Sequence, residues 1–345
     1  METKQRNNLV DIIRGIAILM VILGHTISNN NITEYENSII YKIIWTLQMP
    51  LFMIISGYIT KYSKKIDNIR SLRCYIAKRT FSYILPWMVW TFIIRNILIS
   101  GRNITELPEL CIYIINHMDS GYWFLFCIWH LCIVWGIANY ISVKIASKAR
   151  IAWTVIMSLL IGGISFIALI VVGGVNFLAV KYSIYYLPFY LLGYVSGHID
   201  YNKINRNFYN AAVLIALIIF AISVCRYNIY FSADTISDIC IRYISSLSGC
   251  VVVIYITSEF FKGTHSKLNR FLATVGRESI GLYLTHYIYL SIIKNNAAVS
   301  LYSMEGCISI MLNYVITIMF TLITVYLIKH IKYADMILFG RKTRK

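Results

Sequence analysis

The sequence predicts an all-α, polytopic integral membrane helical bundle of about ten transmembrane helices, with both termini in the cytoplasm. Of its 345 residues, 58% are hydrophobic and 14% are charged, whereas a soluble domain carries about 25% charged residues. Apolar stretches of about 17 to 25 residues recur along the chain, and a helix of that length crosses the hydrocarbon core of a bilayer. The predicted helices cover residues 9–28, 39–60, 81–99, 123–142, 151–172, 183–198, 208–225, 240–258, 275–293 and 307–328.

The first five helices follow from long apolar runs. The first is long, contains ionisable residues and lacks a small-residue cleavage site, so we expect it to be retained and not removed as a signal peptide. The second contains Pro50 and the pair Ser56-Gly57, which can break a helix or allow close helix packing. The third follows a basic loop, the fourth begins in an aromatic run, and the fifth is a plain apolar stretch.

The last five helices include the two least regular ones. The sixth is short and contains Pro188, Gly193 and Gly197, and the ninth is less apolar after Glu278. The seventh, eighth and tenth are continuous apolar runs. The distribution of basic residues supports counting the sixth and the ninth, because removing either one would place later basic loops outside the cytoplasm.

The net charge of +17 indicates membrane topology and not nucleic-acid binding. With the N-terminus inside, 24 of the 32 Lys and Arg residues fall in predicted cytoplasmic loops or at their edges, as the positive-inside rule requires. Many of the 27 tyrosines lie near predicted helix ends, where they suit an aromatic belt at the membrane interface. We therefore expect a multi-pass protein of a cell membrane, the inner or plasma membrane of a bacterium, with the lipid bilayer and no nucleic acid among its partners.

The chain is expected to form one membrane domain over residues 1–345. No repeat, linker or low-complexity block divides it, and no segment is left for an appended soluble domain. The eight cysteines include no Cys-x-x-Cys pair, and no cluster of residues has the spacing of metal ligands. We expect no metal and no permanently bound cofactor.

Two ionisable residues of the first helix, Arg14 and His25, indicate a functional site, because ionisable groups within a bilayer are costly. Their separation of eleven residues corresponds to about three helical turns plus 20°, so they share one face about 16 Å apart. Asp11 can pair with Arg14 three residues away. Two alternatives remain open: Arg14 could extend towards inner headgroups, and His25 could be an interfacial histidine.

Further short motifs follow in a fixed order, and together with the Arg-x10-His pair they resemble the acyltransferase 3 family of integral-membrane O-acyltransferases. Within it the chain is most similar to the compact fucose-4-O-acetylase-like branch, over Leu9 to about His286. The family motifs fall on Arg14 and His25, Ser56-Gly57-Tyr58, Lys78-Arg79 with Pro86, Trp123-Phe124-Leu125, and Gly276-x-x-Ser279-x-x-x-Tyr283-x-x-His286. Glu278 stands where Asn is common in the family.

The resemblance implies an enzyme, a membrane-bound O-acyltransferase that transfers an acyl group, usually acetyl from acetyl-CoA, to surface polysaccharide. Acetyl-CoA would be a donor substrate, and a glycan or lipid-linked sugar of the cell envelope would be the acceptor. We expect catalytic roles for His25 and His286, with His25 as general base, since a neutral imidazole suits that role at neutral pH. The other expected site residues bind the donor (Arg14, Lys78 and Arg79) or support the site (Asp11, Ser56, Trp123, Ser279 and Tyr283).

Several alternatives to this assignment stay open. His286 could be a buried packing residue, the oxyanion donor could be His286, Tyr283 or Ser56, and the acetyl group could be carried transiently on His25. The main alternative from another class is a transporter or flippase for a lipid-linked glycan. A carrier would more naturally show internal repeats with paired broken helices, and no repeat is visible here.

Overall fold

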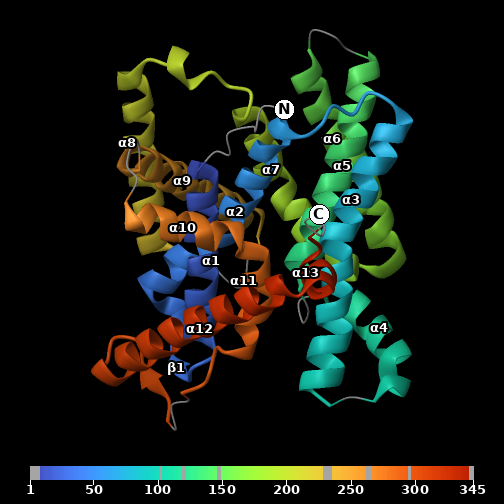
Figure 1. Ribbon diagram of the computed structural model, residues 1–345. Helices are drawn as coiled ribbons and strands as arrows, with labels where there is room; N and C mark the ends of the chain where they lie inside the picture. The colour runs from blue at the N-terminus through green and yellow to red at the C-terminus, as the bar shows by residue number, and fades with distance from the viewer. Residues whose placement is uncertain are drawn as a thin grey trace. The chain divides into compact units, whose positions relative to one another are not determined.

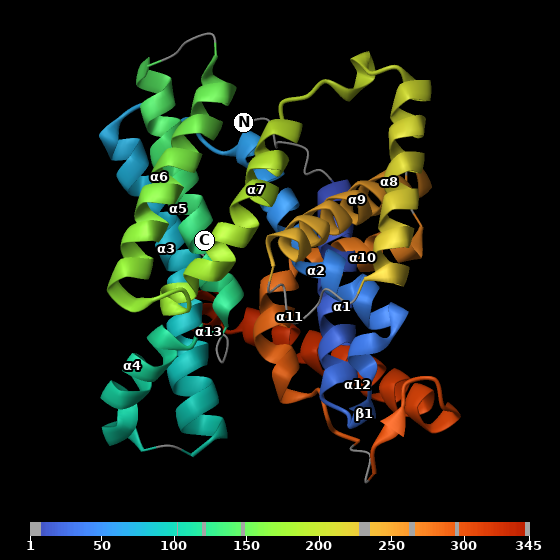
Figure 2. The same cartoon turned by 180° about the vertical axis from the view of Figure 1, so that it is seen from behind.

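The computed structural model describes residues 8–101, 103–118, 122–145, 149–227, 235–261, 266–293 and 297–341. In this part of the chain the fold is all-α (Figures 1 and 2), as the composition predicts. The strands described are two residues each, β1 (Ile32–Thr33) and β2 (Val299–Ser300), and they pair in parallel. The protein is therefore a helical, multi-pass membrane protein.

Eight helices within the described residues are long and apolar enough to span a membrane. They are α1 (Asn8–Ser28), α2 (Ile39–Tyr58) with the turn η2 (Ile59–Tyr62), α3 (Ile69–Met88) continued by the π-helix η3 (Val89–Ile99), α5 (Trp123–Ile145), α6 (Arg150–Gly173), α8 (Arg206–Arg226), α9 (Ile236–Phe260) and α12 (Met304–His330). Each contains one of the predicted spans or most of it.

The shorter elements complete the chain. The α-helices are α4 (Leu107–Asn116), α7 (Val180–Ser196), α10 (Lys267–Arg277), α11 (Ser279–Thr285) and α13 (Lys332–Phe339). The 3-10 turns are η1 (Tyr35–Asn37), η4 (Ile104–Glu106), η6 (Phe177–Ala179), η7 (Tyr201–Lys203) and η8 (His286–Ile288). The predicted sixth span corresponds to α7, whose 17 residues lie at the lower end of the lengths that cross a bilayer, about 17 to 25 residues.

The prediction of one continuous helix over 275–293 is wrong. Helix α10 ends at Arg277, α11 has 7 residues, and a 3-10 turn follows at His286. The backbone amide of Glu278 still donates to the carbonyl oxygen of Thr274, but Glu278 itself leaves the helical region at φ −93° and ψ 6°, and α10 ends there. A broken helix is tolerated at membrane depth when it is enclosed by protein, and α11 is buried along almost its whole length.

The chain divides into two compact units, and the first comprises Met1–Ile55 and Ile199–Leu327. In it, α10 lies across α1 (Figure 1). The two helices approach through glycines: a Cβ added at Gly15 would overlap the carbonyl oxygen of Leu272, and one added at Gly276 would overlap that of Asp11. Glycine lets two backbones pack this closely within a membrane.

The second unit comprises Ser56–His198 and Ile328–Lys345. Helices α3, α5 and α6 run side by side in it (Figure 2). Gly57, at the end of α2, packs directly on the backbone of Tyr190 in α7. At the C-terminal end, the indole Nε1 of Trp90 donates to the carbonyl oxygen of Leu338 at 2.9 Å and so holds α13 against η3.

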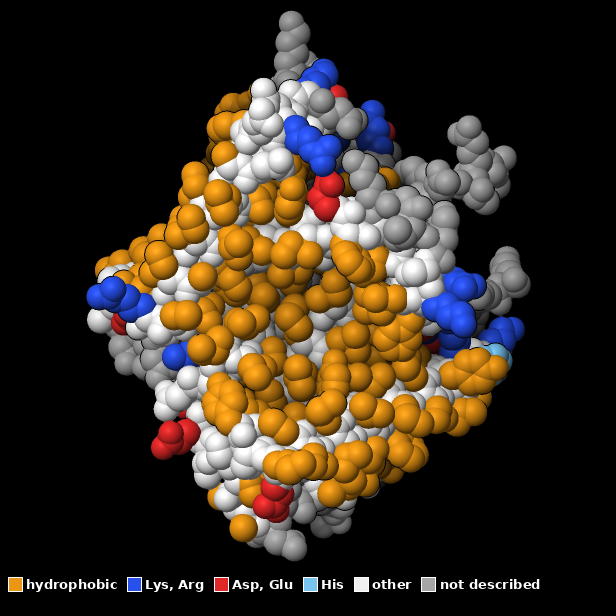
Figure 3. All heavy atoms as spheres, turned by 90° about the vertical axis from the view of Figure 1, so that its left-hand side faces the viewer, with side chains coloured by type: hydrophobic (Ala, Val, Ile, Leu, Met, Phe, Trp, Pro, Cys, Tyr) orange, Lys and Arg blue, Asp and Glu red, His pale blue; other side chains and the backbone are white. Residues whose placement is uncertain are grey.

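The exposed surface is itself apolar, as a lipid-facing surface requires. Figure 3 shows hydrophobic side chains covering the middle of one face, with the charged side chains at its margins. On α8 the exposed fractions of Leu214 and Ile218 are 58% and 51%, and on α12 Met311 is 67% exposed. A contiguous apolar surface of this kind is rare on a monomeric soluble protein.

Candidate active site

Three aromatic side chains of the first unit form the candidate site: His25 from the last turn of α1, and His286 and Tyr287 from η8. The ring centroids are 5.3 Å apart for His25 and His286, 4.8 Å for His25 and Tyr287, and 4.4 Å for His286 and Tyr287. The structure thus brings together the two histidines that the sequence analysis names as catalytic candidates, from opposite ends of the chain.

Helix α1 ends just after His25, and the end is well capped by local polar groups. The carbonyl oxygen of His25 accepts from the backbone N–H of Asn29 at 3.1 Å and from its Nδ2 at 2.8 Å. The hydroxyl of Thr26 donates to the carbonyl oxygen of Ile22 at 2.8 Å. These bonds satisfy carbonyls at the end of the helix and fix the backbone that carries His25.

Two buried asparagines connect this helix end to the segment that follows η8. Nδ2 of Asn30 donates to the carbonyl oxygens of Thr26 and Leu290, at 2.6 and 3.0 Å. Nδ2 of Asn313, in α12, donates to Oδ1 of Asn30 at 2.8 Å and to the carbonyl oxygen of Ile293 at 2.7 Å. Oδ1 of Asn313 accepts from the Ile293 amide at 3.0 Å. We call Asn30 and Asn313 the asparagine clasp.

The histidine His286 is fully enclosed, and its hydrogen bonds define its tautomer. Its Nδ1 lies 3.1 Å from the carbonyl oxygen of Leu282. A carbonyl oxygen only accepts, so Nδ1 carries the hydrogen and Nε2 carries the lone pair of the neutral ring. Nε2 is buried without a hydrogen-bond partner among the described residues. The site therefore contains an unused proton acceptor inside the protein.

The histidine His25 is more accessible than His286. It is half-buried, whereas the exposed fraction of His286 is 0%. The hydroxyl oxygen of Tyr287 lies 3.0 Å from Nε2 of His25 and 3.4 Å from Nδ1, and Tyr287 is 45% exposed. A substrate that enters this site meets His25 and Tyr287 before His286.

The sequence analysis did not name Tyr287, although it touches both histidines. It directly follows the last residue of the final family motif, and that adjacency is the one signal that points to it. Its contact with His25 joins residues 262 positions apart. No local pattern encodes such a contact.

The remaining site predictions in the first unit fall on α1 and α11. Asp11 is buried beside the α10 glycine Gly276, and Arg14 is half-buried one turn further along α1. Arg14 and His25 lie on one unbroken helix, about 16 Å apart along its axis. Ser279 and Tyr283 are buried in α11, and the Tyr283 ring centroid is 5.9 Å from that of His286.

The second unit holds Ser56, Lys78, Arg79 and Trp123. Ser56 is half-buried beside Gly57, near the end of α2, and Lys78 is exposed on α3. Trp123 begins α5 and stacks on Tyr182, with ring centroids 4.0 Å apart and an interplanar angle of 20°.

The surroundings of Arg79 differ from those of Lys78. Its guanidinium lies over the Tyr75 ring, 5.1 Å from the centroid. Its Nε is buried and has no hydrogen-bond partner among the described residues, and the same holds for the Tyr75 hydroxyl. A guanidinium with a buried N–H that no described residue accepts makes this a candidate binding site for an anion.

The described residues contain no group of three or more His, Cys, Asp and Glu side chains that could hold a metal ion. The candidate site offers two imidazoles and a phenol, which are groups that accept, donate and relay protons.

Comparison with known proteins defines the family. A family model described as an acyltransferase domain matches residues 7–330, nearly the whole chain. The chain belongs to the acyltransferase 3 family. The nodulation protein NolL of Sinorhizobium fredii (strain NBRC 101917 / NGR234) is 26% identical over 127 residues, which cover 36% of this chain and 34% of that protein. The chain thus spans about a third of the length of this relative. No solved structure matches the chain.

The family match runs through both compact units of the acyltransferase. It includes the α1 and η8 segments that carry the candidate site as well as the Arg79 region of α3. All of these segments therefore lie within the residues that the family model matches.

Proposed function

We propose that this acyltransferase transfers an acetyl group from acetyl-CoA to a hydroxyl group of a cell-surface or exported glycan, with His25 as general base. The observation that carries the proposal is the cluster of His25, His286 and Tyr287. It combines an accessible imidazole, an enclosed imidazole of defined tautomer and a phenol in one place.

In the proposed reaction the sugar oxygen forms a bond to the thioester carbonyl carbon, and the carbon–sulfur bond of acetyl-CoA breaks. His25 takes the proton of the sugar hydroxyl as that oxygen attacks. The same proton then passes to the sulfur atom of the departing CoA, so that His25 returns to its neutral form. A positioned general base contributes a factor of about 10² to 10⁴ in rate.

The tautomer of His286 supports a role as acceptor and not as donor. Since its Nδ1–H is bonded to Leu282, the neutral ring has no hydrogen on Nε2 to offer to an oxyanion. Its Nε2 lone pair can accept a hydrogen bond or a proton, and the His25 ring centroid is 5.3 Å from that of His286. Tyr287 has an O–H within reach of His25, and this group is the better candidate to donate to the developing oxyanion.

We assign the donor phosphates to Arg14, Lys78 and Arg79. Arginine binds phosphate through a planar fork of N–H groups, and Arg79 has a buried N–H with no hydrogen-bond partner in the part of the chain that the structure describes. Under the positive-inside assignment these residues are on the cytoplasmic side, where acetyl-CoA is made. The glycan would then approach His25 from the opposite side of the membrane.

The experiment is an assay of thiol release from acetyl-CoA by the full-length protein in nanodiscs, with and without surface-glycan acceptors. We expect acceptor-dependent release of free CoA and acetylated glycan, and a loss of about 10² or more in rate for His25→Ala. His117→Ala is the matched control, because that histidine is exposed and its ring nitrogen Nδ1 bonds to the carbonyl oxygen of Tyr113 in α4, at 3.0 Å.

Two results would contradict the proposal. If His25→Ala retained the wild-type rate, His25 would not be the general base. Transport of a lipid-linked glycan across sealed vesicles, with no thiol release for any acceptor, would instead identify a carrier.

A further inference from the structure

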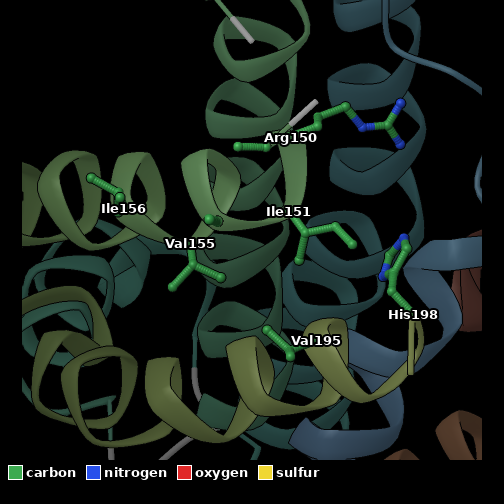
Figure 4. A pocket seen from close by; sticks show the side chains of 8 residues that line it. Arg150, Ile151, Val155, Ile156, Val195 and His198 are labelled. Carbon is green, nitrogen blue, oxygen red and sulfur yellow. The ribbon is translucent and has the colours of Figure 1, made fainter. Parts of the chain in front are cut away.

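A groove in the second unit is lined by residues not discussed so far. It has a volume of about 770 Å³, within the range of about 300 to 1,000 Å³ typical of small-molecule sites. Its walls come from the first turns of α6 and the last turns of α7, and six of the lining side chains are labelled in Figure 4: Arg150, Ile151, Val155, Ile156, Val195 and His198.

The groove is apolar along its walls and polar at one edge. In Figure 4, Arg150 and His198 lie on the same side of the groove, with Ile151 between them, while Val155 and Ile156 line the other side. The eight described residues that line it include no acidic side chain. A ligand that fits this groove has a hydrocarbon part and an anionic end.

The apolar wall continues outwards along α6. Ile156, Leu160 and Ile164 follow one another at intervals of four residues and so form one stripe on the helix. Their exposed fractions are 44%, 52% and 71%. Ile156 belongs to both the groove and the stripe, so a hydrocarbon chain whose end is held in the groove can extend along α6 into the bilayer.

Among the described lining residues, the polar edge offers one permanent positive charge and one hydrogen-bond acceptor. Arg150 supplies the charge as the first residue of α6, where the helix dipole also favours an anion. His198 bonds through Nδ1 to the carbonyl oxygen of Tyr194 at 2.9 Å, so Nδ1 donates and Nε2 is the acceptor of the neutral ring.

We infer that this groove is a binding site for an anionic glycerophospholipid of the cytoplasmic leaflet. The phosphodiester, with its single negative charge, binds Arg150, a headgroup hydroxyl donates to Nε2 of His198, and an acyl chain follows the apolar stripe of α6. Phosphatidylglycerol has all three features. Acetyl-CoA carries several phosphate charges and no long hydrocarbon chain, so it fits a site with one arginine poorly.

The positive-inside assignment agrees with this location. It places the loop before α6 and the loop after α7 in the cytoplasm, and basic pockets between helices on that side attract anionic lipid headgroups. The inference does not depend on the identity of the acyl donor or acceptor. Its failure would leave the proposed reaction untouched.

The test is a lipid titration of the full-length, detergent-solubilised protein, followed by native mass spectrometry. The probes are phosphatidylglycerol and phosphatidylcholine with the same acyl chains. We expect the wild-type protein to retain phosphatidylglycerol preferentially. Arg150→Gln should weaken that binding about fivefold and leave phosphatidylcholine binding unchanged, because one basic side chain contributes about 1 kcal/mol near an anionic lipid.

Two further variants separate this groove from the general basic charge of the protein. Ala152→Trp fills the groove without a change in charge and should remove the bound lipid; Ala152 is exposed, so the larger side chain does not enter the core. Arg206→Gln is the matched control, because Arg206 is exposed, pairs with Glu259 at 3.5 Å and lies outside the groove.

An equal loss of phosphatidylglycerol in Arg206→Gln and Arg150→Gln would show diffuse electrostatic attraction and overturn the inference. So would displacement of phosphatidylglycerol by a polyisoprenyl phosphate at a lower concentration, since the groove would then be a site for a lipid-linked sugar carrier. Size-exclusion profiles of all variants must match that of the wild type.

Discussion

At the scale of single residues, His25 and His286 have the same side chain in very different surroundings. His286 is enclosed and bonded through one nitrogen to the backbone, whereas His25 is half-buried and its hydrogen-bond contact is the hydroxyl of an exposed tyrosine. A base that exchanges protons with substrates must be reachable by them, and this favours His25 for that role. His286 suits a role in orientation and charge stabilisation.

The contact between Tyr287 and His25 yields the prediction at this scale. Tyr287→Phe removes one hydroxyl and keeps the ring that packs on both histidines. We expect kcat to fall about tenfold, the rate equivalent of about 1.5 kcal/mol for a hydrogen bond to a charged group, with little change in the KM for acetyl-CoA. Steady-state kinetics of the purified protein measures both quantities.

Tyr289→Phe is the control for this measurement. The Tyr289 hydroxyl lies 2.7 Å from Oγ1 of Thr324 in α12 and contacts neither histidine. An equal fall in kcat for both variants would mean that the loss is structural. An unchanged kcat in Tyr287→Phe would show that this hydroxyl has no role in the mechanism.

At the scale of elements, the crossing of α1 and α10 places the candidate site. Gly15 and Gly276 allow the two backbones to touch, and α11 then begins two residues after α10 ends. The path from Gly276 to His286 is only ten residues long. A shift at the crossing therefore changes where His286 lies relative to His25, which is carried by the same α1.

The prediction for this crossing is a loss of stability on substitution of the glycine. Gly276→Ala places a Cβ against the carbonyl oxygen of Asp11, and an overpacked site costs about 1 to 3 kcal/mol. We expect a lower thermal unfolding temperature of the detergent-solubilised protein. Gly163→Ala, in the middle of α6, is the matched control because no atom lies within 4 Å of the added Cβ.

The control should be neutral or slightly stabilising, since Ala is a better helix former than Gly by about 1 kcal/mol. If Gly276→Ala unfolds at the same temperature as Gly163→Ala, the two helices are able to separate without cost. The close crossing would then not hold the site in place.

The elements also show which structural features could be predicted from the sequence and which could not. The spacing of Arg14 and His25 predicted one shared helix, because helical geometry is local, and the structure has that helix. The break at Glu278 was missed, because hydropathy does not record where the backbone leaves helical geometry, and the burial of α11 is seen only in the folded chain. The asparagine clasp was missed for the same reason, since Asn30 and Asn313 meet only in the folded chain.

At the scale of the whole molecule, the distribution of charge predicts the orientation in the membrane. Most Lys and Arg residues fall in loops assigned to the cytoplasm, as orientation by the positive-inside rule requires. Eight long apolar helices, with the shorter α7 and the broken segment of α10 and α11, are found where the sequence predicts about ten spans. Both termini remain predicted to lie inside.

Labelling of single cysteines with a membrane-impermeant thiol reagent tests this orientation. The exposed native cysteines Cys74, Cys225, Cys240 and Cys307 are first replaced by serine. We expect Glu34→Cys and Glu106→Cys to react in intact cells, and Lys65→Cys and Arg341→Cys to react only after permeabilisation. Labelling of positions 34 and 65 from the same side would contradict the predicted topology.

The asparagine clasp has a consequence for the order of events during biosynthesis. His25 is made near the beginning of the chain, but Tyr287 follows it by 262 positions and Asn313 comes later still. At a synthesis rate of about 5 to 20 residues per second, the ribosome needs roughly 13 to 50 seconds to synthesise the residues from His25 to Tyr287. During that time α1 has no such partners. The first helix therefore stays inserted through most of translation without the polar contacts that later surround its histidine.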